Sequence, residues 1–247
     1  AMMDRRASKN ATLGKTMGWL AFVWRLILTT GTGSIFGFLI AREAYDAAIM
    51  APLFIASSFL YGLAFTILVL LLMCRETRAR LMTQEMIGKF SGLLAIFALA
   101  TLFFTIVQHV TKLYATAHLE SEMFVLRDGG VYTLLFWVGQ ILIGTLLPLG
   151  LLAMQGSGGA NRHNVMLAAI LFLIGGLAQM YVIIIGGQAL PLKIFPGMDV
   201  SSSFFDGAIG RYVPSLPEAL LGVSGISIAM LLTATALRLL PFLPQEQ

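Results

Sequence analysis

Residues 89–113 read KFSGLLAIFALATLFFTIVQHVTKL, and Lys89 and Lys112 are the only Asp, Glu, Lys or Arg residues among them. An α-helix needs roughly 20 consecutive apolar residues to cross the ~30 Å hydrocarbon layer of a bilayer. The stretch therefore predicts a transmembrane helix. Five more apolar stretches of similar length lie at about 16–40, 48–73, 130–154, 164–187 and 215–240.

The overall composition agrees with six membrane crossings. The chain has 247 residues, of which 58% are hydrophobic and 11% are charged, whereas a soluble domain has roughly 45–50% apolar and ~25% charged residues. We therefore predict an all-α protein, a polytopic integral membrane helix bundle with about six transmembrane helices. We expect a single membrane domain over residues 1–247, with its longest connection at 188–214.

Local signals within these stretches agree with helices. Pro148 falls within the fourth predicted span and should kink it. Ser215-Leu216-Pro217-Glu218 has the spacing of a capping box and should open the sixth.

The charges between the apolar stretches alternate in sign from one gap to the next. One side collects the basic residues Arg5, Arg6, Lys9, Lys15, Arg75, Arg78, Arg80, Lys89, Arg162 and Arg238. The other side collects the carboxylates Glu43, Asp46, Glu120, Glu122, Asp128, Asp199, Asp206 and Glu218. Short basic loops stay in the cytoplasm, so both termini are predicted to be cytoplasmic and the acidic loops to face outward. The net charge of +4 then follows from topology, which predicts a lipid bilayer and no nucleic acid as partner.

The sequence offers few ligands for a metal cofactor. Cys74 is the single cysteine, and an iron–sulfur cluster needs about four ligands. A bis-histidine haem needs two histidines at membrane depth, but only His109 lies inside a predicted span, since His118 and His163 fall at or beyond the boundaries. Zinc-type ligand spacing is also absent. We expect no metal site, no haem and no iron–sulfur cluster in this chain.

Polar residues cluster at the outer end of the third predicted span. They are Gln108, His109 and Lys112, with Tyr114 just beyond. His109 and Lys112 are three residues apart and share a helix face. They could donate hydrogen bonds to a quinone carbonyl or relay a proton, because histidine titrates near neutral pH. A helix end that meets lipid headgroups has the same composition, so both interpretations stay open.

A compact polar loop with Arg42, Glu43, Tyr45 and Asp46 follows the first predicted span at the same membrane face. A carboxylate beside an arginine could release protons there or could dock a partner protein, and docking is the favoured interpretation. On the fifth predicted span, Gln179 could line an internal cavity or bind a neighbouring helix.

The first predicted span contains two unusual features. Gly31-Thr32-Gly33 predicts a break in the helix, and irregular backbone at membrane depth needs protein or water to satisfy it. The spacing Gly33-xxx-Gly37 is also a close-packing motif for helices. Arg25 lies within the same span. A charge at depth is costly and often functional, although the long side chain can also extend toward the interface.

Three segments of the chain resemble a known family. The first runs from GSIFG at 33–37 through REAYD at 42–46 to APLF at 51–54, and the second is YTLLFW at 132–137. The third pairs YVPSLPE at 212–218 with LRLLPFLP at 237–244 around one predicted helix. These segments resemble the NrfD family of membrane subunits, which includes the anchors of polysulfide reductase, periplasmic hydrogenase and the sulfite-reduction-associated Dsr complex. The resemblance spans nearly the whole chain and is nearest the Dsr-type subunit.

The resemblance implies a quinone-reactive subunit in a prokaryotic cytoplasmic (inner) membrane. Such a subunit exchanges electrons between the quinone pool, menaquinone or ubiquinone, and a ferredoxin-like iron–sulfur subunit on the outer face, together with cytochrome or other redox subunits. Family members usually have eight to ten helices, so this chain resembles the C-terminal six. The upstream helices, which hold much of the family's quinone pocket, would be absent, split off or supplied by another chain. Some relatives also have a histidine–glutamine pair where this chain has Thr32-Gly33.

From the residues and the resemblance together we predict a quinone-interacting membrane subunit of a respiratory oxidoreductase, with proton transfer as an accompanying activity. In this hypothesis His109 and Lys112 orient or protonate the quinone, and Glu43 or Asp46 exchanges protons with the outer compartment. The expected quinone-binding residues are Thr32, Gly33, Arg42, Gln108 and Tyr114. A non-catalytic membrane anchor is the first alternative. A secondary transporter is the second, although transporters tend to have inverted repeats and paired broken helices, and this sequence has no repeat and one predicted break.

Overall fold

The computed structural model describes residues 2–76, 83–154, 161–191, 209–210 and 212–239, and within these ranges the regular structure is helical and contains no strand. Among these described residues, six helices are long and apolar enough to cross a membrane: Leu13–Gly37, Met50–Leu71, Gln84–Tyr114, Val131–Ala153, Arg162–Ala189 and Leu216–Thr235. Each coincides with one predicted stretch, so the all-α fold with six spans is confirmed. The side of the membrane on which the termini lie stays a prediction, and most of the predicted loop 188–214 lies outside the described residues.

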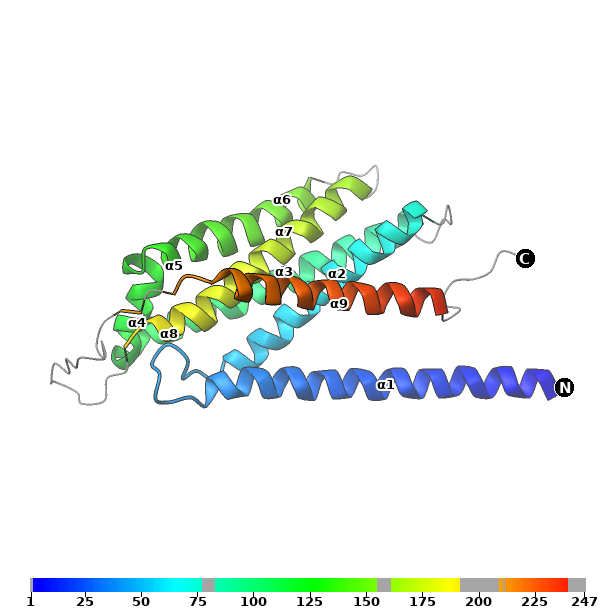
Figure 1. Cartoon of the computed structure of the whole chain (residues 1–247), viewed down its shortest axis with the longest axis horizontal. Helices are drawn as coiled ribbons and strands as arrows, with labels where there is room; N and C mark the ends of the chain where they lie inside the picture. Colours follow the sequence, from blue (N-terminus) through cyan, green and yellow to red (C-terminus); the bar gives the residue numbers. More distant parts are fainter. Residues whose placement is uncertain (1, 77–82, 155–160, 192–208, 211, 240–247) are drawn as a thin grey trace. The chain divides into compact units, whose positions relative to one another are not determined.

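The chain forms two compact units, residues 1–210 and 211–247. The first contains the following helices (Figure 1): α1 (Met2–Gly37), α2 (Met50–Glu76), α3 (Gln84–Tyr114), η1 (Thr116–His118), α4 (Leu119–Met123), η2 (Phe124–Asp128), α5 (Val131–Leu134), η3 (Leu135–Leu146), α6 (Leu147–Ala153), α7 (Arg162–Tyr181), η4 (Val182–Gly186) and α8 (Gly187–Ala189). The second contains α9 (Leu216–Leu239). At its start the Ser215 N–H donates to the Glu218 carboxylate at 2.7 Å, which is half of the predicted capping box.

Helix α1 is continuous through Gly31–Gly33, so the predicted break there is wrong. The Thr32 hydroxyl donates to the Leu28 carbonyl one turn earlier, at 3.0 Å, and this bond belongs to a regular helix. Gly33 serves packing instead. A Cβ at this position would lie 2.7 Å from the Ala51 Cα, so glycine is what lets α1 and α2 touch. The close-packing interpretation of this motif is therefore the correct one.

The fourth span changes its helical winding along its length. Between the α-helical ends α5 and α6, the segment η3 is a π-helix of 12 residues, a geometry that is rare and frequently found at functional sites. We predicted that Pro148 kinks this span. It lies in the first turn of α6, and because proline has no backbone N–H it donates no hydrogen bond to a carbonyl of the preceding turn. Gly144 on η3 lies against Gly175 on α7, and a Cβ on either would overlap the other's backbone.

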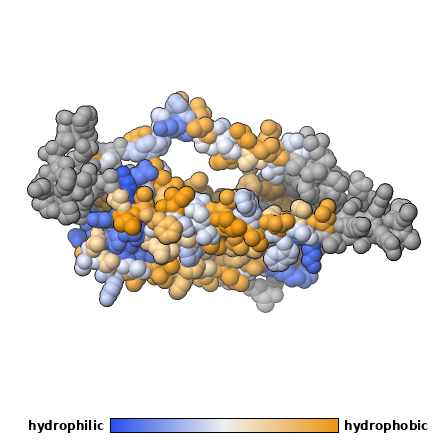
Figure 2. All heavy atoms as spheres, turned by 90° about the horizontal axis from the view of Figure 1, so that it is seen from below, coloured by the Kyte–Doolittle hydropathy of each residue, from blue (hydrophilic) through white to orange (hydrophobic). Residues whose placement is uncertain are grey.

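The larger apolar core of the first unit lies toward one end of its helices, and a smaller apolar cluster of Phe124, Tyr132 and Ala189 lies toward the other end. The apolar core is formed by Leu60, Ala64, Ile67, Leu71, Ile87, Leu94, Ala98, Leu152, Val165, Ala168, Ala169 and Phe172. Residues 38–49 and 115–130 connect the helices at the end that holds the smaller cluster, which we call the loop end. Most buried polar side chains lie toward the loop end. These side chains are Thr101, Thr105, Gln108, Lys112, Ser121, Glu122, Gln140 and Gln179. Figure 2 shows hydrophobic side chains along the helices and hydrophilic ones gathered near their ends.

Candidate functional site

A histidine–glutamate pair lies inside the loop end. His109 is near the end of α3, and the chain then turns through η1 so that α4 brings Glu122 back against it. His109 Nδ1 donates to Oε1 of Glu122, and the side chains are 17% and 3% exposed. The Phe136 ring meets the imidazole edge-on at a centroid distance of 4.6 Å. A carboxylate this buried needs a hydrogen-bonded or charged partner, so the two side chains form one hydrogen-bonded pair with the Phe136 ring against it.

A buried lysine lies one turn further along the same helix. Lys112 is 4% exposed, and its Nζ donates to the Ala44 carbonyl in the loop 38–49. Glu122 and Asp46 supply the negative charges that act on it. Lysine is almost never fully buried unless it is paired, and here the Ala44 carbonyl accepts from the ammonium group while the two carboxylates act on its charge from nearby.

The loop 38–49 is fastened to the end of the fifth span. Arg42 Nη1 donates to the carbonyls of Gln188, at 3.1 Å, and Leu190, at 3.2 Å. Gln188 belongs to the last turn of the span and Leu190 is the residue that follows it, and carbonyls at a helix end have no partner within the helix. The Arg42 side chain therefore caps that helix end and fixes the loop in place.

Tyr45 fixes the same loop from inside. It is 2% exposed, and its hydroxyl donates to the Ile184 carbonyl at 2.8 Å. Gly187 faces its ring, and a Cβ there would lie 2.6 Å from a ring carbon. Burial raises the pKa of the Tyr45 phenol, an effect that the Arg42 charge and a hydrogen bond with Gln188 partly offset.

His118 is a site residue that the sequence did not single out. Its Nδ1 donates to the Glu43 carbonyl at 3.0 Å, and its Nε2 lies 3.7 Å from an Asp46 carboxylate oxygen. It thus connects η1 to the loop 38–49. Only the fold-back after α3 brings it there, so sequence spacing gave no signal for this contact.

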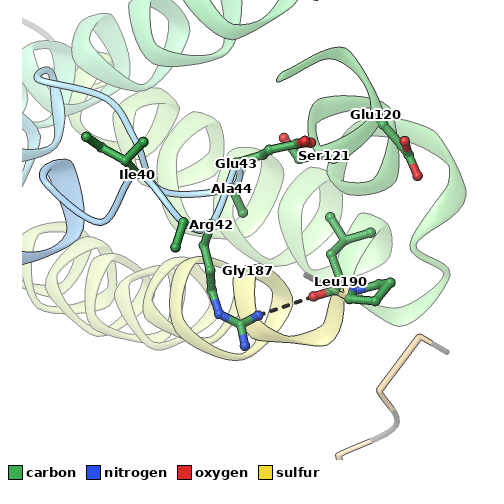
Figure 3. A pocket seen from close by; sticks show the side chains of 10 residues that line it. Ile40, Arg42, Glu43, Ala44, Glu120, Ser121, Gly187 and Leu190 are labelled. Atoms are coloured by element: carbon green, nitrogen blue, oxygen red, sulfur yellow. Dashed lines mark hydrogen bonds between the residues drawn. The ribbon is translucent and has the colours of Figure 1, made fainter. Parts of the chain in front are cut away.

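Two cavities meet behind this loop. The larger, about 210 Å³, is lined by Arg42, Glu43, Glu120, Ser121 and Leu190 among others. Figure 3 shows Arg42 reaching the Leu190 carbonyl, while Glu43 and Glu120 lie on the other side of the cavity.

The smaller cavity, about 30 Å³, is lined by His109, Lys112, Glu122, Gln140 and Gln179 among others. The two cavities share Ala44, Ser121 and Gly187 as a common wall. The smaller one has room for about one water molecule.

The polar lining continues deeper into the bundle through three glutamines. Gln108, Gln140 and Gln179 are all buried and line the smaller cavity. The Tyr61 hydroxyl donates to Gln179 Oε1, whereas Gln179 Nε2 has no hydrogen-bond partner among the described residues. An orphaned buried amide is costly, and a bound water in the neighbouring cavity would satisfy it. For Gln179 the sequence left a cavity role and a contact with a neighbouring helix open. It missed Gln140, although a polar residue within an apolar span was a usable signal.

The structure brings most, but not all, of the predicted site residues together. Gln108, His109, Lys112, Arg42, Glu43 and Asp46 gather around the two cavities and the loop 38–49. Tyr114 is 91% exposed at the end of α3. Thr32 and Gly33 belong to the continuous helix α1 and line neither cavity. Within the described residues no group of three or more His, Cys, Asp or Glu is placed to hold a metal ion.

The six apolar spans and the polar loop end define a multi-pass membrane protein with buried polar side chains and two cavities near one end of its helices. A family model described as polysulphide reductase, NrfD, matches residues 6–191. The chain belongs to the NrfD family, and it is a protein of a prokaryotic cytoplasmic membrane.

Two curated relatives are similar to the chain. It is 27% identical over 236 residues to the Hdr-like menaquinol oxidoreductase integral membrane subunit of Archaeoglobus fulgidus, an alignment that covers 93% of this chain and 58% of that protein. It is 25% identical over 219 residues to a selenate reductase subunit of Mesobacillus selenatarsenatis, covering 88% of this chain and 49% of that protein. The chain thus spans about half the length of the curated relatives it matches. No solved structure matches it significantly.

Proposed function

We propose that the chain is the quinone-interacting membrane subunit of a respiratory oxidoreductase. The observation that carries this proposal is the His109–Glu122 pair, which lies with Lys112 against a cavity in an otherwise apolar helix bundle. Ionisable groups at membrane depth mark proton or substrate pathways. Membership in the NrfD family and the menaquinol oxidoreductase named in one relative support a quinone as the ligand.

The larger cavity is the proposed place for the quinone headgroup. Arg42 lines this cavity. The wall that the larger cavity shares with the smaller one separates the larger cavity from the His109–Glu122 pair. A quinol gives up two electrons and two protons when it is oxidised, and a quinone takes up the same number when it is reduced. The protein therefore needs proton acceptors beside the ring oxygens. His109 and Glu122 are such groups, and a water in the smaller cavity would connect them to the headgroup.

The remaining side chains would move the proton away from the pair. Glu43 lines the larger cavity. Asp46 lies 3.7 Å from His118, and its charge acts on Lys112. Carboxylates in these places could pass protons to the solution at the loop end. Toward the opposite end the apolar core contains no such chain of groups among the described residues. We therefore propose that proton exchange takes place at the loop end.

The electrons would leave or arrive through partner proteins. We propose a ferredoxin-like iron–sulfur subunit docked at the loop end, with cytochrome or other redox subunits in the same complex. The sequence supplies one cysteine and three histidines for the whole chain, so metal centres in partners fit this composition.

Quinol turnover by the purified complex tests the proposal. His109→Ala should lower the turnover number by about 100-fold, the usual size of a general acid–base contribution, while the complex stays assembled. His163→Ala is the matched control, because His163 lies in the first turn of α7, at the end opposite the site, and it should leave turnover unchanged. Normal turnover of an assembled His109→Ala complex would favour a purely structural membrane anchor.

A further inference from the structure

The imidazole of His118 lies between two oxygen atoms of the loop 38–49. Its Nδ1 is 3.0 Å from the Glu43 carbonyl oxygen, and its Nε2 is 3.7 Å from a carboxylate oxygen of Asp46. A carbonyl and an ionised carboxylate only accept hydrogen bonds. A neutral imidazole has one N–H and can serve one of these oxygens, whereas an imidazolium has two and can serve both. The arrangement therefore matches a positively charged ring.

Three elements meet at His118: the loop 38–49, the end of α3 and the short helix α4. Arg42 is bonded to the carbonyls at the end of the fifth span, and Glu122 is bonded to His109. The charged side chains on the three elements are Arg42, Glu43, Asp46, Lys112, Glu120 and Glu122. Among the ion pairs of the described residues, Asp46 is the one that His118 makes, so its carboxylate is the charge that responds to a proton on the ring.

Two basic side chains hold neighbouring carbonyls of this loop. His118 donates to the carbonyl of Glu43, and Lys112 donates to that of Ala44. Residues 40–44 form one wall of the larger cavity (Figure 3), so both bonds act on that wall. The Ser121 hydroxyl donates to the His118 carbonyl at 2.8 Å, which fixes the histidine to α4. Histidine is the residue type that changes its charge between about pH 5 and pH 8.

We propose that His118 is a proton-controlled clasp on the wall of the larger cavity. The charged ring holds the Glu43 carbonyl and the Asp46 carboxylate together, and loss of its proton releases Asp46 and loosens the loop 38–49. The contribution of such an ion pair is present at low pH and is lost as pH rises through the titration of the histidine. Acid at the loop end therefore closes the cavity. The clasp depends on these contacts, and the identity of the ligand that it admits, a quinone, rests on the proposed function.

A spin label on the loop tests the clasp without any quinone. Ala48 is exposed near the end of the loop, and Cys74 is the one native cysteine, so Ala48→Cys in a Cys74→Ser chain takes a single nitroxide. Electron paramagnetic resonance of the full chain in lipid nanodiscs gives the ratio of mobile to immobile label. We expect this ratio to rise about two- to fivefold between about pH 5.5 and pH 7.5, which is the size of a partly exposed ion pair.

Three variants of the labelled chain assign the transition. His118→Asn keeps an N–H for the Glu43 carbonyl but does not titrate, so it should show the high-pH ratio at every pH. Asp46→Asn removes the anion and should also abolish the transition. His163→Gln is the matched control, because it removes a histidine in the first turn of α7, at the end opposite the loop. It should keep the full transition.

Hydrogen exchange provides a second readout on the unlabelled, unsubstituted chain. The protection of the amides in residues 38–49, corrected for the pH dependence of intrinsic exchange, should fall by the same factor over the same range. Constant mobility and constant protection from about pH 5.5 to pH 7.5 would overturn the proposal. So would a transition that persists in His118→Asn, because another group would then control the loop.

The outcome is independent of the test of the proposed function. A loop that does not respond to pH, in a complex whose turnover depends on His109, would remove the clasp and leave the quinone site. A loop that responds as expected, in a complex whose turnover does not depend on His109, would leave the clasp and remove that mechanism.

Discussion

Glu122 contacts His109 across a reversal of the chain, because α3 ends at Tyr114 and α4 folds back along it. The contact occupies Nδ1 of the imidazole and leaves Nε2 as the nitrogen available to a ligand or water. A carboxylate in this position fixes the ring orientation and stabilises the imidazolium that forms when the ring takes up a proton. The pair should therefore behave as one unit in any proton transfer.

Glu122→Gln keeps the size of the side chain but removes its negative charge. We expect quinol turnover to fall by about 100-fold, and the double variant with His109→Ala to be no slower than His109→Ala alone, because groups that act as a unit are not additive. Steady-state kinetics of the purified complex provide the measurement. Glu85→Gln, an exposed carboxylate at the opposite end, should turn over normally. Additive losses in the double variant would separate the two roles.

Lys112→Met should loosen the loop 38–49. The substitution leaves the half-buried Ala44 carbonyl without its donor and Glu122 without a nearby positive charge. We expect a loss of about 1–3 kcal/mol in stability, measured as a lower thermal midpoint of the detergent-solubilised protein. Lys89→Met, which removes a lysine that is 71% exposed, should change the midpoint little. Equal midpoints for the two variants would contradict the proposed role of Lys112.

Gly144→Ala tests the contact between the fourth and fifth spans. The added methyl group would overlap the backbone of Gly175, and overpacking of this kind costs about 1–3 kcal/mol. Gly150→Ala in the same span is the matched variant, because its Cβ would meet nothing within 4 Å. It should be neutral or stabilising by up to about 1 kcal/mol. Thermal unfolding of both variants in the same detergent decides the point.

Tyr45 should make the protein's stability depend on pH in the alkaline range. Its pKa is raised in the folded protein, so its contribution is fully present below the unfolded value of ~10 and is lost as pH rises through the folded value. Tyr45→Phe loses the hydrogen bond to Ile184, about 1 kcal/mol at neutral pH. Its thermal midpoint should then fall less than that of the unmodified protein between about pH 9 and pH 11.

The control for this pH dependence is Tyr114→Phe, because Tyr114 is 91% exposed. This variant should follow the unmodified protein at every pH. A Tyr45→Phe protein with the same alkaline loss as the unmodified protein would show that another group is responsible.

The six spans could be predicted from the sequence alone, because bilayer thickness sets the length of apolar sequence that a transmembrane helix needs. It also placed His109 and Lys112 on one face of α3, since that depends only on helix periodicity. It could not supply Glu122 or His118 as their partners. Both residues follow a chain reversal whose direction is set by packing, and in the sequence they look like ordinary loop residues.

The error at Gly31–Gly33 has a different origin. Glycine permits irregular backbone but also permits close approach of two helices, and a single sequence does not distinguish these uses. The position of Ala51 in α2 decides between them. Tyr114 was grouped with the site because it is near in sequence, but the helix ends there and the side chain lies outside the site.

The fold-back that joins Glu122 to His109 also bears on how the protein is made. Neither residue has its partner until the third span is in the bilayer and the segment after it has emerged, and Phe136, which covers the imidazole, arrives only with the fourth span. The site is thus completed by synthesis of later residues. A ribosome stalled before the fourth span would leave a nascent chain in which Phe136 has not yet packed against the His109–Glu122 pair.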